Sequence, residues 1–209
     1  MKISRKELDK NIKRVLKNIV KGYGYKTRGN VLYKKYKDYF ISILISSTGQ
    51  NNNLINIRGN IKPYFMDDIF WDIFKMEDNI KAPMGLRADG AFTVRSLQIF
   101  NENREVADYQ EVENYVKELL LECDKYIIKI IEELGEDLWK FIAYSHEQAN
   151  PGLFKYALAK MLLDIREKNY QEAYNTAVEE LNNHRYGGLQ NEGKDIYEHI
   201  KYYCENKIN

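Results

Sequence analysis

A regular alternation of apolar and polar residues between Val31 and Ile61 predicts the central sheet of the protein. The run from Tyr39 to Ser47 is rich in β-branched and aromatic residues and contains no Gly, Pro, Asp or Asn, a composition typical of a strand. The run from Leu54 to Ile61 alternates again. Because successive side chains of a strand point to opposite faces, one face of this sheet is apolar and faces the core. Its members are Tyr39, Ile41, Ile43, Ile45, Ile55, Ile57 and Ile61.

Shorter segments extend this sheet. Asn30 to Tyr36 pairs with the Tyr39 strand through a polar hairpin, and Tyr25 to Arg28 adds a short edge strand. The segment from Ala91 to Phe100 predicts a further strand, which joins the sheet after a helical crossover. Gly59 interrupts the apolar face, so we expect a bulge or a close backbone approach at this position.

The first segment of the chain, Ser4 to Val20, predicts an amphipathic helix whose apolar stripe packs on the isoleucine face of the sheet. Ser4 and Glu7 form a capping-box pattern at its start, and Gly22 and Gly24 end it. Together these elements predict an α+β fold, with an N-terminal helix packed on an antiparallel β-meander of about four to five strands and followed by a C-terminal helical half.

Apolar residues at steps of three and four predict the helices of that second half. The longest helix extends from Asp108 to Leu134 and ends at Gly135. A helix that starts at Asn150-Pro151 makes Phe154 the helical partner of a hydrophobic staple. The other expected segments are helices at 66–76, 136–147, after residue 169 and at 190–203, with a loop at 77–90. We predict a domain of residues 1–105 with a helical region, 106–209, packed against it, or one continuous domain.

The composition is that of an ordinary globular protein, with 44% hydrophobic and 30% charged residues among 209. No apolar run approaches the roughly 20 residues of a membrane helix, and the N-terminal residues lack the apolar region of a secretory signal. Cys123 and Cys204 are the two cysteines, far apart in the sequence, so a disulfide framework is not expected. These features predict a cytoplasmic protein.

Positive charge is concentrated at the N-terminal end of the chain. The first 37 residues hold thirteen Lys or Arg against two acids, a local charge of +11, so that the remainder carries −10 within the net +1. Such asymmetry indicates either a nucleic-acid-binding segment or a solvated basic surface. The nucleic-acid interpretation is strengthened by the interleaved aromatic residues Tyr23, Tyr25, Tyr33 and Tyr36.

The order of the N-terminal elements resembles that of a known family. The residues that carry the resemblance are Gly24-Tyr25-Lys26-Thr27-Arg28-Gly29-Asn30, Leu32-Tyr33-Lys34-Lys35, the strand from Phe40 to Ser46, and Leu54-Ile55-Asn56-Ile57-Arg58-Gly59. With this GY-K-x-x-G-N turn motif, residues 12–61 resemble an uncharacterised bacterial family classed as a domain of unknown function. The family shows a glycine soon after the Asn, whereas this chain has Arg58 before Gly59. The resemblance implies the helix-plus-sheet fold and carries no activity.

No motif in the sequence commits the chain to a chemistry. Metal-binding, phosphate-cradling and nucleophile-elbow patterns are absent, and the three histidines, His146, His184 and His199, are interpreted as helix-end or surface residues. The candidate ligand-binding set is Asn56, Arg58 and Asn60 on the polar sheet face, joined by Arg95 from a neighbouring strand. An arginine beside amides holds a carboxylate or phosphate well. The alternative is a solvated face, or an arginine paired with Asp67 or Asp68.

These observations favour a non-enzymatic binding or interaction module, with the sheet face and a helical hairpin as contact surfaces. The first alternative is nucleic-acid binding through the basic N-terminal segment, and the second is an enzyme with an anion-binding site near Arg58. A protein partner is the first expectation and nucleic acid the second, with no membrane association. No catalytic residue, metal site or cofactor is predicted.

Overall fold

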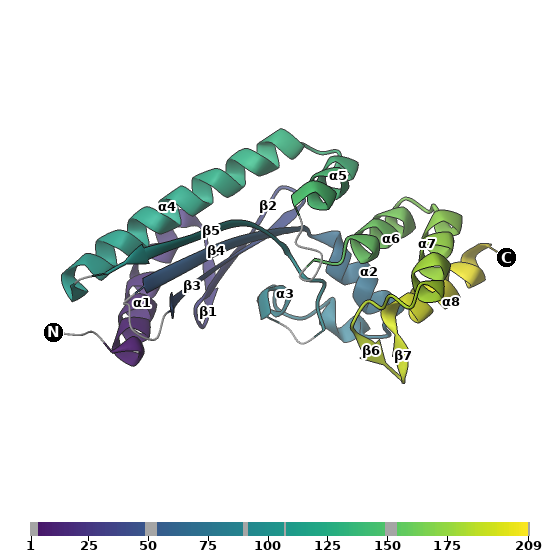
Figure 1. The fold of residues 1–209 in the computed structure, drawn as a ribbon, viewed down its shortest axis with the longest axis horizontal. Helices are drawn as coiled ribbons and strands as arrows, with labels where there is room; N and C mark the ends of the chain where they lie inside the picture. The colour runs from purple at the N-terminus through teal and green to yellow at the C-terminus, as the bar shows by residue number, and fades with distance from the viewer. Residues whose placement is uncertain (1–3, 49–53, 90–91, 107, 149–153, 209) are drawn as a thin grey trace. The chain divides into compact units, whose positions relative to one another are not determined.

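The computed structural model describes residues 4–48, 54–89, 92–106, 108–148 and 154–208. The chain forms two compact units, each built from two separated segments (Figure 1). Unit 1 comprises Met1–Lys62 and Ser96–Glu133, and unit 2 comprises Pro63–Arg95 and Leu134–Asn209. The boundary expected near residue 105 therefore falls inside unit 1, between its last strand and its long helix.

Unit 1 is a five-stranded antiparallel sheet with helices, which confirms the predicted α+β class. Its strands lie in chain order and are β1 (Lys26–Arg28), β2 (Val31–Tyr36), β3 (Tyr39–Thr48), β4 (Leu54–Pro63) and β5 (Leu97–Glu105). The helical elements are α1 (Arg5–Ile19), the short 3₁₀ helix η1 (Val20–Tyr23) and α4 (Tyr109–Leu134).

The isoleucine face of the sheet is its buried face, as the alternation predicts. Ile43 lies opposite Leu32 of β2, and all the isoleucines at odd positions of β3 and β4 are inaccessible to solvent. The strand register shifts between Gly59 and Asn60, which is the predicted irregularity. The apolar face therefore forms the core of unit 1.

Helices α1 and α4 together cover this face. A Cβ added to Gly59 would lie 2.7 Å from Cys123 Sγ and 2.8 Å from Ile127 Cδ1, so α4 crosses directly over β4 at the glycine. Helix α1 contacts β3, and Val15 of α1 lies beside Val112 of α4, so the two helices are neighbours in one layer. At the start of α1 the Ser4 hydroxyl accepts from the Glu7 N–H at 3.3 Å and donates to the Glu7 carboxylate, which confirms the predicted cap.

Unit 2 is mainly helical. Helix α7 packs on both α6 and α8, and α6 also contacts α2 and α5. Its elements are α2 (Phe65–Ile73), the 3₁₀ helix η2 (Glu77–Asn79), α3 (Leu86–Asp89), α5 (Leu138–Gln148), α6 (Tyr156–Arg166), α7 (Tyr170–Asn182), β6 (Gln190–Asn191), β7 (Lys194–Asp195) and α8 (Ile196–Ile208).

The last strand of the sheet begins later than the sequence predicts. The segment before Leu97 is held by side chains of α2, since the Trp71 indole donates to the Phe92 carbonyl at 2.6 Å and the Val94 N–H donates to Asp67 at 2.8 Å. These contacts occupy backbone groups that a strand would use, so β5 is displaced to residues 97–105. The expected loop at 77–90 likewise contains η2 and α3.

Two expectations for the C-terminal helices are wrong. The helix expected at 190–203 starts at Ile196, because Gln190–Asn191 and Lys194–Asp195 form a hairpin whose turn residues Glu192 and Gly193 have positive φ. Phe154 is not helical but precedes α6, and its ring packs edge-on against Phe141 at 6.2 Å. Its expected role in a staple is therefore not realised, while the Asn150-Pro151 start lies outside the described residues.

We predict that Gly59→Ala lowers the free energy of unfolding by about 1–3 kcal/mol, because the added methyl group overlaps Cys123 and Ile127 of α4. Chemical denaturation followed by circular dichroism measures the change. Gly22→Ala is the matched control, since its Cβ meets nothing within 4 Å. Equal unfolding midpoints for the two variants would contradict the close packing of β4 on α4.

Candidate functional site

The predicted polar face of the sheet is partly closed by its own amides. Asn56 is 7% exposed and donates to Asn101 Oδ1 at 2.9 Å and to Asn103 Oδ1 at 3.0 Å, across the β4–β5 pair. Asn60 is half-buried and donates to the Ser42 carbonyl at 3.3 Å. The expectation that Asn56 lies in water is therefore wrong, because neighbouring amides hold it against the sheet.

The two predicted arginines have different settings. Arg58 is exposed on β4 and has no hydrogen-bond or ion-pair partner among the residues that the structure describes. Arg95 is exposed but precedes β5 in an irregular segment and belongs to unit 2, so it is not a strand neighbour of Arg58. Arg58 and Asn60 remain together on one strand, and an anion site there stays a prediction.

The acids considered as partners for Arg58 are engaged by a different arginine. Arg87 of α3 is 5% exposed, forms ion pairs with Asp67 and Asp68, and donates to the Tyr64 carbonyl at 3.0 Å. Its guanidinium also lies 4.0 Å from the centre of the Tyr64 ring. This buried cluster connects α2 to α3 and is structural, since a buried charge pair of this kind needs its remaining hydrogen bonds satisfied.

The outer face of α1 is a row of lysines. Lys6, Lys10, Lys13 and Lys17 follow one another at steps of four and three, so they lie on one side of the helix over roughly 16 Å. All four are exposed, and none has a hydrogen-bond or ion-pair partner within the described parts of the chain. A shallow depression runs along this surface.

Two other lysines of unit 1 pair with acids of α4. Lys34 of β2 lies 2.7 Å from Asp124 of α4, and Lys37 pairs with Glu132 of the same helix. Helix α4 thus supplies acids to the neighbouring sheet, while the lysine row of α1 receives none from the described residues.

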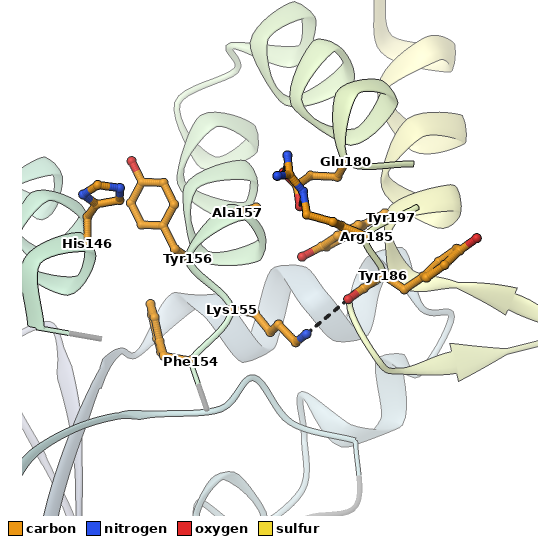
Figure 2. Close-up of a pocket in the computed structure, with 9 residues that line it drawn as sticks. All are labelled: His146, Phe154, Lys155, Tyr156, Ala157, Glu180, Arg185, Tyr186 and Tyr197. Atoms are coloured by element: carbon orange, nitrogen blue, oxygen red, sulfur yellow. Dashed lines mark hydrogen bonds and ion pairs between the residues drawn. The ribbon is translucent and has the colours of Figure 1, made fainter. Parts of the chain in front are cut away.

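A pocket of about 470 Å³ lies in unit 2 between α5, α6 and the segment from α7 to α8 (Figure 2). His146 and Tyr156 form one wall, with ring centroids 4.8 Å apart in an edge-on arrangement. Lys155 lies below Ala157 and donates to the Tyr186 carbonyl at 3.3 Å, and Arg185 lies across the pocket from Tyr156. Aromatic rings and cationic groups from separate elements therefore converge on one space.

Asp195 does not line the pocket but organises the turn that follows Tyr186. Its carboxylate, 3% exposed, accepts from the N–H groups of Gly187 at 2.9 Å, Gly188 at 3.1 Å and Tyr197 at 3.0 Å. A Cβ on Gly187 would lie 2.1 Å from Ile196 Cγ2, so the turn requires glycine there. The N–H groups of this glycine pair hold a carboxylate of the chain itself, and this fixes Tyr197 beside the turn.

The three histidines have different settings in the fold. Within the described residues no group of three or more His, Cys, Asp or Glu is arranged to hold a metal ion. His146 is in the last turn of α5 and His184 lies at a turn after α7, as expected, whereas His199 is buried with a ring nitrogen 3.0 Å from the Asn191 carbonyl. Its interpretation as a surface or helix-end residue is therefore wrong, because it holds the β6–β7 hairpin against α8.

Both cysteine thiols are fully buried. Burial raises the pKa of Cys204 to about 12, with a further contribution from Asp164, and burial with Asp124 raises the pKa of Cys123 as well. At neutral pH neither sulfur is a thiolate, and the thiolate is the reactive form.

Comparison of the chain with protein-family models, curated proteins and solved structures finds no match. The resemblance of residues 12–61 to a bacterial domain family therefore stays a prediction. Among the described helices none is both long and apolar enough to cross a lipid bilayer.

We predict that Asp195→Ala destabilises the protein by at least about 2 kcal/mol, because three backbone N–H groups lose a charged acceptor. Asp195→Asn retains one acceptor oxygen and is expected to lose less. Thermal unfolding of the two variants shows which substitution lowers the stability more. If Asp195→Ala and Asp195→Asn both lower the stability by the same small amount, the carboxylate of Asp195 does not hold the turn.

We predict that the folded protein reacts very slowly with a thiol reagent such as Ellman's reagent at pH 8, because both raised thiol pKa values lie above that pH. Raising the pH toward 10 in the folded state gives little acceleration. Unfolding in guanidinium releases both thiols at once, and that reaction is the internal control. Rapid labelling of either cysteine in the native protein contradicts this assignment.

Proposed function

We propose that this chain is a binding module that contacts the phosphate backbone of nucleic acid through the lysine row of α1. The observation that carries the proposal is the unpaired state of Lys6, Lys10, Lys13 and Lys17 among the described residues. Lysines that bind phosphates release the counterions condensed on nucleic acid, and this release supplies most of the binding free energy.

The two acids of α1 form no ion pair with the row among the described residues, and both have hydrogen-bond partners in the fold. The Glu7 carboxylate accepts from the Ser4 hydroxyl at 2.7 Å at the start of the helix. Asp9 accepts from the Ser47 N–H of β3 at 3.0 Å and so anchors the helix to the sheet. Arg14 faces Glu113 of α4 and is left out of the phosphate-binding set for that reason.

A membrane surface is a poorer partner than nucleic acid for this helix. Amphipathic helices bind bilayers by inserting their apolar side among the lipids. The apolar side of α1, formed by Leu8, Ile12, Val15 and Leu16, is at most 3% exposed and already packed in unit 1. Only the lysines remain for an external contact, so we expect an electrostatic interaction without insertion.

Two of the four tyrosines in the basic segment, Tyr25 and Tyr33, are too buried for base stacking, and Tyr23 and Tyr36 are half-buried. Tyr25 is 4% exposed and Tyr33 is 9% exposed, and the Tyr25 hydroxyl donates to Asp124 at 2.6 Å. Bases of a single strand need exposed ring faces on which to stack. The contact we propose is therefore with phosphates alone, independent of sequence, and no stronger for single strands than for duplexes.

We predict that the protein binds a fluorescently labelled duplex at low ionic strength, with log K falling against log salt at a slope of about −3 to −4 for four phosphate contacts. Changing all four lysines of the row to glutamine removes the binding, and each single Lys→Gln change reduces the slope by about one. Fluorescence anisotropy across a salt series measures both. Glutamine has nearly the helix propensity of lysine, so α1 remains folded.

The matched control replaces the exposed Lys81, Lys125 and Lys140 with glutamine. This variant loses three positive charges that do not belong to α1, against four in the α1 variant, and is expected to keep most of the affinity. Loss of binding in the control to the same extent as in the α1 variant would show a general charge effect. Absence of binding to duplex or single strand at low salt would end the proposal.

A further inference from the structure

One hydroxyl group that lines the pocket of unit 2 has no hydrogen-bond partner among the described residues. Tyr197 is 2% exposed, and its hydroxyl has no hydrogen bond to any residue that the structure describes. The hydroxyl end of the ring faces the α6 side of the pocket (Figure 2). A hydroxyl without a partner in the protein can donate a hydrogen bond to a molecule bound in the pocket.

The Tyr197 hydroxyl is available as a donor. Burial raises its pKa above the ordinary tyrosine value, Glu180 and Asp195 raise it further, and Arg185 opposes them. The group therefore keeps its proton at physiological pH. It presents an O–H group in a space that has few acceptors of its own.

Two cations and one acid line the same space. The Lys155 ammonium uses one of its three N–H groups on the Tyr186 carbonyl, which leaves two for a ligand. Arg185 is bound to Glu180 through two hydrogen bonds of 2.7 and 3.1 Å, so these two charges offset each other. Among these three charged residues, only the positive charge of Lys155 is not offset. A singly charged anion matches this charge better than a polyphosphate does.

The walls favour a flat ligand. His146 and Tyr156 form an aromatic wall, and Ala157 leaves open space beside it (Figure 2). Tyr186 is 53% exposed at the rim. The volume of about 470 Å³ lies within the usual range for small-molecule sites, which are mostly apolar with a few fixed polar groups.

We propose that this pocket binds a small organic carboxylate that carries a flat ring, with the carboxylate accepting from Tyr197 and Lys155 and the ring lying against Tyr156. The site is independent of the lysine row of α1, since every residue that forms it belongs to unit 2.

Isothermal titration with benzoate tests the site, with benzamide as the neutral isostere and phenyl phosphate as the doubly charged one. We expect saturable binding of benzoate, at least tenfold weaker binding of benzamide, and phenyl phosphate no tighter than benzoate. Tyr197→Phe removes only the hydroxyl and is expected to weaken benzoate binding about tenfold or more. Lys155→Met has a similar effect, and Ala157→Leu fills the space and abolishes binding.

Tyr202→Phe is the matched control, because Tyr202 lies on the same helix, is 65% exposed and does not line the pocket. It is expected to bind benzoate as the unaltered protein does. Circular dichroism melts of each variant confirm that it is folded at the titration temperature. Failure of the folded, unaltered protein to bind benzoate at millimolar concentration overturns the proposal. Equal binding of benzoate and benzamide, or unchanged binding by both Tyr197→Phe and Ala157→Leu, overturns it as well.

Discussion

The close approach of α4 to the backbone of β4 at Gly59 is the constraint on which the architecture of unit 1 depends. A Cβ atom on Gly59 would lie only 2.7 Å from Cys123 Sγ. The helix therefore lies closer to the sheet than a residue other than glycine at position 59 would permit. That proximity brings Asp124, the next residue of α4, within reach of Tyr25 and Lys34. The hydrogen bond and ion pair that result attach β1 and β2 to the helix, so one missing Cβ sets the packing of the layer.

The elements that the sequence predicts correctly are those whose signal is local. The alternation of β3 and β4, the apolar stripe of α1 and the seam of α4 each report a face turned toward the core, and burial confirms them. The cap of α1 is readable for the same reason, because Ser4 and Glu7 are three residues apart. The sequence shows Gly59 as an interruption of the apolar pattern. It does not show that Cys123 and Ile127 are the residues that pack against this glycine.

The features that the sequence does not predict arise from contacts between distant segments. Trp71 and Asp67 hold residues 92–94 out of the sheet, and nothing within 92–94 signals this. The pocket of unit 2 joins residues from 146 to 197 that share no periodicity. The glycine pair Gly187-Gly188 indicates a turn next to this pocket. The carboxylate that holds the turn comes from Asp195, eight residues after Gly187, and the glycines do not indicate it. The polar face of the sheet is less exposed than the sequence predicts for a similar reason. Asn101 and Asn103 of β5, distant in the sequence, accept hydrogen bonds from Asn56.

Composition alone does not distinguish a functional basic segment from a bias toward lysine, and our proposal depends on the alignment of four unpaired lysines along one side of α1. Asp124 and Glu132 of α4 pair with Lys34 and Lys37, and Glu113 of α4 faces Arg14 of α1. Glu7 and Asp9 cap α1 and anchor it to the sheet. The fold thus neutralises one part of the basic segment and leaves the row from Lys6 to Lys17 uncompensated among the described residues. Like charges at steps of four destabilise a helix slightly, so a polyanion that bound this row, as we propose, would also stabilise α1.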